Sequence, residues 1–146
     1  MYGATGGTIQ KIQSIINSAA RLISGAHRFD HITPILRDQL HWLPFRFRIV
    51  YKIALMVYRC LHQSGPAYLT EMLIPVNTIT NRTQLRSAQH GDLLCPVYRT
   101  TRVGPASFRS SGPHVWNSLP PFLRDPTISI ELFKTNLKTH LFKIAY

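Results

Sequence analysis

The chain has 146 residues, and its 17 Lys and Arg against 6 Asp and Glu give a formal net charge of +11. This length suits one compact domain with its own core, and a hydrophobic share of 45% excludes the composition of a disordered chain. The charge favours polyanionic partners such as nucleic acid. The cations are spread from Lys11 to Lys143 without forming a block, so folding has to assemble any basic surface.

The N-terminal stretch MYGATGGTIQ lacks the charged and apolar regions of a secretory signal. The most apolar stretch, IVYKIALMVY, has ten residues and includes Lys52, whereas a spanning helix needs roughly 20 apolar residues. We therefore expect a soluble intracellular protein, cytoplasmic or nuclear and not secreted. Cys60 and Cys95 are expected to be reduced and packed.

The hydrophobic pattern predicts a helical subdomain over residues 9–73, preceded by a flexible N-terminus at residues 1–8. Its first helix is expected over residues 9–24, where apolar residues recur at spacings of three and four, and Gly25 is expected to end it. The apolar stripe consists of Ile9, Ile12, Ile15, Ile16, Ala19, Leu22 and Ile23. Such a stripe is typical of a helix that packs through one face.

Three further helices are expected in this subdomain. Thr33 as N-cap and Pro34 as first helical residue predict a short helix in TPILRDQL. Pro44 predicts the start of a longer helix that ends before Gly65. The segment GPAYLTEML predicts one more short helix.

Residues 74–111 are rich in Thr, Asn, Gly and Pro, which predicts a loop-rich segment with short strands around QLRSA and ASFRS. Residues 112–146 are expected to form a C-terminal helical segment. In it Gly112 and Pro113 precede a helical turn, and Ser129 caps the last helix. The expected fold is mainly α, a small helical domain with a short β element in a loop-rich middle segment, and all parts belong to one compact domain.

No motif in the sequence supports catalysis. No two of the six acidic residues are adjacent, so the sequence contains no motif of clustered carboxylates that would indicate a two-metal site. The only candidate zinc ligands are Cys60, His62, His90 and Cys95, and their spacing lacks the close cysteine pairs that make zinc-binding motifs specific. We expect no catalytic residue, no metal and no cofactor, and keep a small enzyme that uses Cys60 or Cys95 as a remote alternative.

Two tryptophans could stack on nucleic-acid bases. Trp42 lies in HWLP and Trp116 lies in VWNSLP, so each is followed closely by a proline that belongs to a turn. This context favours core anchoring over base stacking for both.

Six blocks occur together in the chain: QSIINSAARLISG, DHITPILRDQLHWLPFRFRIVYKI, GPAYLTEML, LRSA, SGPHVWNSLP and FKTNLKTHLF. In this order and with these separations, they resemble the segment that follows the polymerase domain at the C-terminal end of LINE-type (non-LTR) retrotransposon reverse transcriptases. The resemblance extends from about Gln10 to Tyr146. GPASF, at residues 104–108, lacks the charged residues that the family usually carries there.

The polymerase domain with its paired aspartates and the endonuclease domain are both missing from this sequence. The resemblance therefore implies a non-catalytic accessory segment that helps to hold template RNA and target DNA. Carried over by position, the residues expected to contact phosphates are Arg46, Arg48 and Lys52 beside the HWLP turn, Arg82 and Arg86 around LRSA, Arg99 and Arg102 in YRTTR, and Lys134 and Lys138 in the last helix.

The expected partners are the phosphate backbone of RNA or DNA and the polymerase domain of the parent protein, with no membrane and no small-molecule substrate. Nucleic-acid binding is the leading hypothesis, as a fragment or relic of a reverse transcriptase. The alternative is a structural module that packs on the parent polymerase and has no independent activity. That alternative predicts exposed apolar surface and self-association of the isolated chain.

Overall fold

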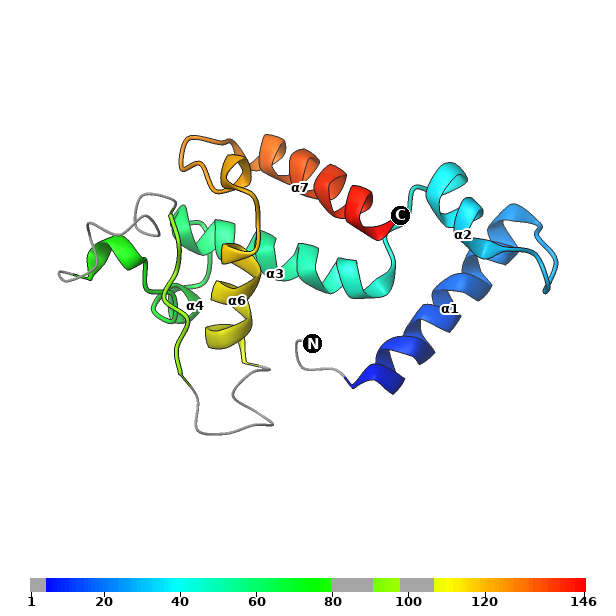
Figure 1. Ribbon diagram of the computed structural model, residues 1–146, viewed down its shortest axis with the longest axis horizontal. Coiled ribbons are helices and arrows are strands. Elements are labelled where there is room, and N and C mark those ends of the chain that lie inside the picture. The colour runs from blue at the N-terminus through cyan, green and yellow to red at the C-terminus, as the bar shows by residue number, and fades with distance from the viewer. Residues whose placement is uncertain (1–4, 80–90, 98–106) are drawn as a thin grey trace.

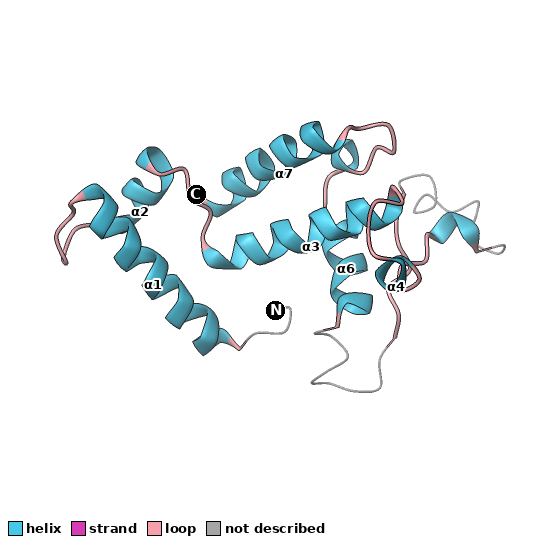
Figure 2. Ribbon diagram, turned by 180° about the vertical axis from the view of Figure 1, so that it is seen from behind, coloured by secondary structure: helices cyan, strands magenta, loops and turns pink. Residues whose placement is uncertain are grey.

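The helix α3, Phe45–Leu61, runs through the middle of the molecule, and α6 and α7 pack against it (Figure 1). The computed structural model describes residues 5–79, 91–97 and 107–146. These residues are mainly helical, which confirms the expected fold class. Seen from behind, α1 lies at one end of the molecule and α4 at the other (Figure 2).

The remaining elements are short or peripheral. In chain order they are α1 (Gly6–Ser24), α2 (Ile32–Pro34), the π-helix η1 (Ile35–Gln39), α4 (Ala67–Thr70), the 3-10 helix η2 (Val76–Thr78), α6 (Phe108–Asn117), the 3-10 helix η4 (Pro121–Leu123) and α7 (Ile130–Ala145). Within the described ranges no strand is formed, and an isolated antiparallel bridge joins Pro75 to Leu93.

The sequence correctly predicts the ends of the two outer helices. Gly25 ends α1 with a φ of 71°, a left-handed conformation that glycine adopts without steric cost. The Ser129 side chain accepts a hydrogen bond from the Leu132 N–H at the start of α7. The helix α1 begins earlier than predicted, at Gly6, because the Thr5 side chain accepts from the Thr8 N–H and caps it there.

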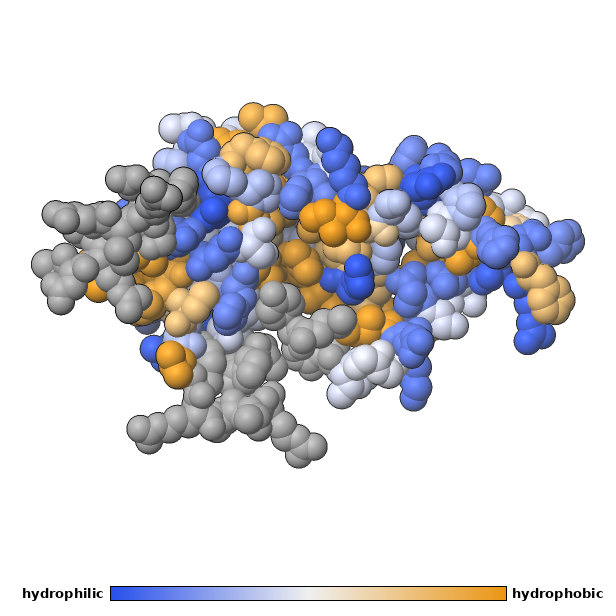
Figure 3. All heavy atoms as spheres, in the orientation of Figure 1, coloured by the Kyte–Doolittle hydropathy of each residue, from blue (hydrophilic) through white to orange (hydrophobic). Residues whose placement is uncertain are grey.

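The core lies where α3, α6 and α7 meet. Val57 and Phe133 are fully buried, Trp116 is nearly so, and the ring of Tyr58 stacks on that of Phe133 with centroids 4.4 Å apart. Each buried apolar side chain of this size contributes about 1.5–3 kcal/mol. On the face drawn in Figure 3, hydrophobic residues gather over this middle region, and hydrophilic side chains cover most of the α1 and α2 end.

The predicted apolar stripe of α1 is only partly packed, because Ile9, Ile12, Ile16 and Ala19 are half-buried while its other three members are exposed. Ile15, Leu22 and Ile23 are 67%, 86% and 61% exposed, and Ala20 is the one residue of α1 that is fully buried. A polar contact also holds the helix, because the Phe45 N–H donates to the Gln13 side-chain oxygen at 2.7 Å. The Gln13 and Ala20 side of α1 therefore faces the body, and three of the seven stripe residues, Ile15, Leu22 and Ile23, remain in solvent.

Two predicted boundaries in the first half are wrong. The N-cap of α2 is His31 and Thr33 lies inside the helix, so Pro34 ends α2 and the chain continues into the π-helix η1. The flexible N-terminus cannot include residues 6–8, because these are helical.

The boundary of the C-terminal segment is also wrong. Residues 107–110 of the stretch ASFRS do not form a strand, because Phe108–Ser110 begin α6, where the Ser107 carbonyl accepts from the Ser110 and Ser111 N–H groups. Gly112 and Pro113 lie within α6 and do not precede it. The strand expected around QLRSA lies outside the described residues.

Across the described part of the chain, none of the helices combines the length and the apolar character needed to cross a membrane.

Candidate nucleic-acid interface

Three of the predicted phosphate contacts come together between α3 and α7. A cavity of about 320 Å³ is lined by Leu43, Arg48, Tyr51, Lys52 and Lys138. Arg48, Tyr51 and Lys52 come from the first half of α3, and Lys138 comes from α7. We call this cavity the Tyr51 pocket. The packing of α7 on α3 thus unites cations that are separated by 86 positions in sequence.

A second cavity shares one wall with the first. It has about 400 Å³ and is lined by His41, Lys138, Thr139, Phe142 and Lys143. We call it the Phe142 pocket, and the two pockets together are the basic groove. Because Lys138 lines both cavities, its ammonium group can serve a ligand in either of them.

Arg48 is fixed in place by the turn before α3. Its Nε donates to the Leu43 carbonyl at 2.9 Å, and its Cζ lies 5.3 Å from the centroid of the Trp42 ring. A guanidinium over an indole face is a cation–π contact. These two contacts orient Arg48 on the wall of the Tyr51 pocket, so less side-chain entropy is lost when it binds a phosphate.

The same turn is tied to the end of α7. The Tyr146 hydroxyl donates to the Trp42 carbonyl at 2.6 Å, and the Phe142 ring lies 4.9 Å from Tyr146 and 6.2 Å from His41, centroid to centroid. Burial raises the pKa of Tyr146, with the positive charge of Arg48 acting in the opposite direction. The hydroxyl therefore keeps its proton and can donate it to Trp42.

The groove is positive because no acidic side chain lines it. All six acidic residues lie in the described ranges, and none borders either pocket. Asp38 lies close enough to His41 for the charge of the histidine to act on it, but both of its carboxylate oxygens accept from Arg37, at 2.7 and 2.9 Å. The hydrogen bond from Arg37 lowers the pKa of Asp38.

The other predicted residues do not line the groove. Arg46 lies on α3 with its Cζ 4.5 Å from the centroid of the Phe47 ring, and Lys134 lies one turn before Lys138 on α7. Neither borders the two pockets. The remaining four, Arg82, Arg86, Arg99 and Arg102, lie outside the described residues.

Sequence reasoning missed six lining residues, namely His41, Leu43, Tyr51, Thr139, Phe142 and Lys143. Tyr51 and Phe142 belong to amphipathic helices, where an aromatic residue is usually assigned to the core. His41 could have been found from the sequence, because it lies next to Trp42 in the block DHITPILRDQLHWLPFRFRIVYKI. Lys143 was visible as a cation off the apolar face of the last helix.

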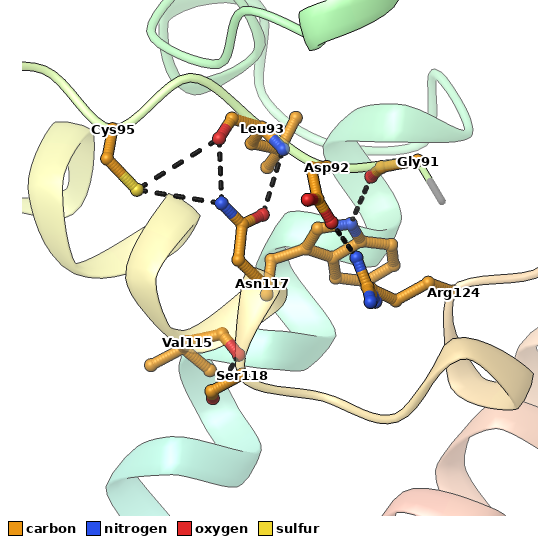
Figure 4. A network of polar contacts seen from close by, with 9 residues as sticks. Gly91, Asp92, Leu93, Cys95, Val115, Asn117, Ser118 and Arg124 are labelled. Atoms are coloured by element: carbon orange, nitrogen blue, oxygen red, sulfur yellow. Dashed lines mark hydrogen bonds and ion pairs between the residues drawn. The ribbon is translucent and has the colours of Figure 1, made fainter. Parts of the chain in front are cut away.

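A separate network of hydrogen bonds anchors the segment 91–95 to α6 (Figure 4). The Asn117 side chain accepts from the Leu93 N–H and donates to the Leu93 carbonyl, each at 2.8 Å. The Trp116 Nε1 donates to the Gly91 carbonyl at 3.0 Å. Trp116 is 3% exposed, so its predicted role as a core anchor is confirmed, whereas Trp42 is only half-buried.

A larger cavity, about 720 Å³, lies beside this network and not in the basic groove. Its Arg124 is paired with Asp92, and the two ring nitrogens of His62 lie 2.9 and 3.2 Å from the carbonyl oxygens of Tyr58 and Pro126. The Arg124 Nε is buried without a hydrogen-bond partner among the described residues, but it is the one such buried atom in this lining, so the cavity offers few free groups that could orient a ligand. We therefore place the candidate interface in the basic groove.

The two cysteines differ in their surroundings. Cys60 is buried, whereas the sulfur of Cys95 lies 3.8 Å from His114 Nδ1 and accepts from the Asn117 amide at 3.6 Å. Burial raises the pKa of Cys95, which lowers its thiolate fraction, and the thiolate is the nucleophilic form. His90, one of the four candidate zinc ligands, lies outside the described ranges. Within those ranges, no three His, Cys, Asp or Glu side chains lie close enough together to bind a metal ion.

Comparison of the chain with protein-family models, with curated proteins and with solved structures finds no match.

Proposed function

We propose that the basic groove binds the phosphate backbone of RNA or DNA, and that the chain acts as a non-catalytic nucleic-acid-binding segment. The observation that carries the proposal is the convergence of four cations, Arg48, Lys52, Lys138 and Lys143, on two adjoining pockets that no carboxylate borders. Like charges that line the same pocket repel each other, and a bound polyanion relieves that repulsion. The resemblance to the C-terminal segment of LINE-type reverse transcriptases points to the same class of partner.

The proposal is tested by fluorescence anisotropy of a labelled DNA duplex, titrated with the purified chain over a series of salt concentrations. Lys52→Gln and Lys138→Gln each remove one cation from the groove without changing the length of the side chain much. Each is expected to weaken binding for every sequence alike and to reduce the salt slope by about 0.9 per lost duplex phosphate contact. Lys11→Gln, on the exposed surface of α1, is the matched control.

A general attraction between the net charge of +11 and DNA would make all three variants alike. Equal losses in Lys11→Gln and Lys138→Gln would therefore remove the groove as the site. Arg46→Gln extends the comparison, since Arg46 lies on the same helix as Lys52 but outside the pockets. Its effect is expected to lie close to that of Lys11→Gln.

A second function is favoured by the exposed stripe on α1. Ile15, Leu22 and Ile23 place large apolar side chains in solvent along one side of a helix that contains no acidic residue. Exposed apolar surface of this kind often marks contact with another protein, in agreement with a packing module of a parent polymerase. Light scattering tests it: the chain is expected to self-associate, and Ile15→Gln with Leu22→Gln is expected to abolish this. A monodisperse wild-type chain would count against it.

A further inference from the structure

The residues that line the basic groove bear on which form of nucleic acid, single-stranded or duplex, it can bind. The Tyr51 pocket combines an aromatic ring and the Leu43 side chain with the cations Arg48 and Lys52. A surface that contacts only phosphates needs no aromatic or aliphatic wall. In a duplex the bases are stacked inside the helix, so their faces cannot reach such a wall.

The Phe142 pocket repeats this composition and shares Lys138 with the Tyr51 pocket. It presents the rings of Phe142 and His41 together with Lys143. The order across the groove is therefore an aromatic pocket, a shared ammonium group and a second aromatic pocket. A single strand has the same order, because consecutive bases flank each phosphate.

The size of the two cavities fits this repeat. At about 320 and 400 Å³ they lie at the lower end of the roughly 300–1,000 Å³ that sites for small organic groups occupy. Tyr51 and Phe142 are both half-buried, so each ring is held by the fold while part of it remains accessible. Rings held in this way serve as stacking platforms in proteins that bind single strands.

Building on the proposed function, we propose that the basic groove selects single-stranded nucleic acid. One base enters the Tyr51 pocket, a second base enters the Phe142 pocket, and Lys138 contacts the phosphate group near both. Arg48, Lys52 and Lys143 hold the flanking phosphates. The chemistry that the site recognises is a run of two unpaired nucleotides, which RNA and DNA both supply.

Four labelled probes of twelve nucleotides or base pairs test this: oligo-dT, oligo-U, a DNA duplex, and a deoxyribose-phosphate strand without bases. Anisotropy at about 150 mM salt is expected to show both base-containing single strands binding roughly tenfold more tightly than the duplex, the equivalent of ~1.4 kcal/mol. The strand without bases carries the same phosphates, and it is expected to lose this advantage. Equal affinity of wild type for oligo-dT and for the strand without bases would overturn the inference.

Two variants locate the bases. Tyr51→Leu and Phe142→Leu keep an apolar side chain but remove the ring, and each is expected to weaken oligo-dT binding about tenfold with duplex binding unchanged. Phe122→Leu is the control, because Phe122 is exposed and borders neither pocket. Thermal melting verifies that each variant folds, and the probe without bases tests the inference on the wild-type chain if one does not.

The experiment separates this inference from the proposed function. If Lys52→Gln and Lys138→Gln weaken binding to all probes alike and wild type shows no preference for single strands, the groove binds phosphates and the base pockets are wrong. If those two variants match Lys11→Gln on every probe, the proposed function itself is wrong. A difference between oligo-U and oligo-dT would show that the sugar or the base methyl group contributes further.

Discussion

The guanidinium of Arg48 lies over the indole of Trp42, with its Cζ 5.3 Å from the ring centroid, while its Nε donates to the Leu43 carbonyl. These contacts need neither of the two terminal nitrogens of the side chain, which can therefore donate to a ligand. Trp42 is in turn held by the hydrogen bond between its carbonyl and the Tyr146 hydroxyl. The turn before α3, the end of α7 and the wall of the Tyr51 pocket thus form one connected structure.

Arg48→Lys is expected to lower both stability and affinity, although the charge is kept. Lysine has no planar group to cover the Trp42 ring and no Nε to donate to Leu43, so the free energy of unfolding should fall by about 1 kcal/mol. Urea unfolding measures this loss, and anisotropy with oligo-dT measures the loss of affinity. Arg109→Lys is the control, because Arg109 is exposed on α6 and lines neither pocket. Equal midpoints for the two variants would contradict the role of the Trp42 contact.

Asn117→Leu is expected to be among the more damaging single changes in α6. The Asn117 amide bonds both the N–H and the carbonyl of Leu93, and Leu93 is 2% exposed. Leucine would leave both backbone groups without these partners, and each such group costs about 1–3 kcal/mol. The expected result is a fall of several kcal/mol in the free energy of unfolding, measured in urea. Asn77→Leu, at an exposed position, serves for comparison, and equal effects would contradict the prediction.

Local signals correctly predicted two helix ends of this fold, although the Thr33 cap was wrong. Gly25 and Ser129 act through the backbone groups of their own helix ends, so their effect could be predicted without knowing what packs on either helix. The packed face of α1 could not be predicted in the same way. On its packed side α1 is joined to the start of α3 by the hydrogen bond from the Phe45 N–H to Gln13, across 32 positions, and periodicity carries no information on such a contact.

The candidate site was likewise predicted only in part. Arg48, Lys52 and Lys138 were predicted as phosphate contacts by resemblance, and the structure brings these three into one pocket. That Arg46 and Lys134 border neither pocket follows from how α7 crosses α3, which no residue pattern within either helix encodes. Tyr51 and Phe142 were missed because an aromatic residue on an amphipathic helix has the same pattern whether it packs in the core or lines a groove.

Gly112→Ala is expected to destabilise the chain, whereas Gly7→Ala is expected to stabilise it. A Cβ at Gly112 would lie 3.2 Å from Val57 Cγ2 and 3.3 Å from Leu73 Cδ2, where α6 crosses α3. Overpacking of this kind costs about 1–3 kcal/mol, against a gain in helix propensity of about 0.5–1 kcal/mol. Nothing lies within 4 Å of a Cβ at Gly7, so only the gain applies there.

Thermal melting of the two alanine variants beside wild type measures the difference. The expected order of midpoints is Gly7→Ala above wild type and Gly112→Ala below it. A midpoint for Gly112→Ala above that of wild type would show that Val57 and Leu73 move aside at little cost, and that α6 is not held at a close distance from α3.

Cys95 is expected to react slowly with iodoacetamide in the folded chain. Burial raises its pKa, the Asp92 charge raises it further, and the hydrogen bond from Asn117 acts in the opposite direction. In a Cys60→Ala background, the alkylation rate should therefore rise at a higher pH in the folded state than in urea. An inflection at lower pH in the folded state would contradict this, and it would favour a Cys95–His114 nucleophile.

The same shift predicts how stability depends on pH. A thiol whose folded pKa is raised keeps its proton in the folded state while the unfolded chain ionises. Its contribution is fully present below the unfolded pKa of about 8.5 and is lost as the pH rises through the folded value. Between pH 7 and pH 10, the urea midpoint of Cys60→Ala, which keeps Cys95, should therefore fall relative to that of the double variant that also carries Cys95→Ala. A difference that is constant over this range would show that the environment of Cys95 does not favour its protonated form.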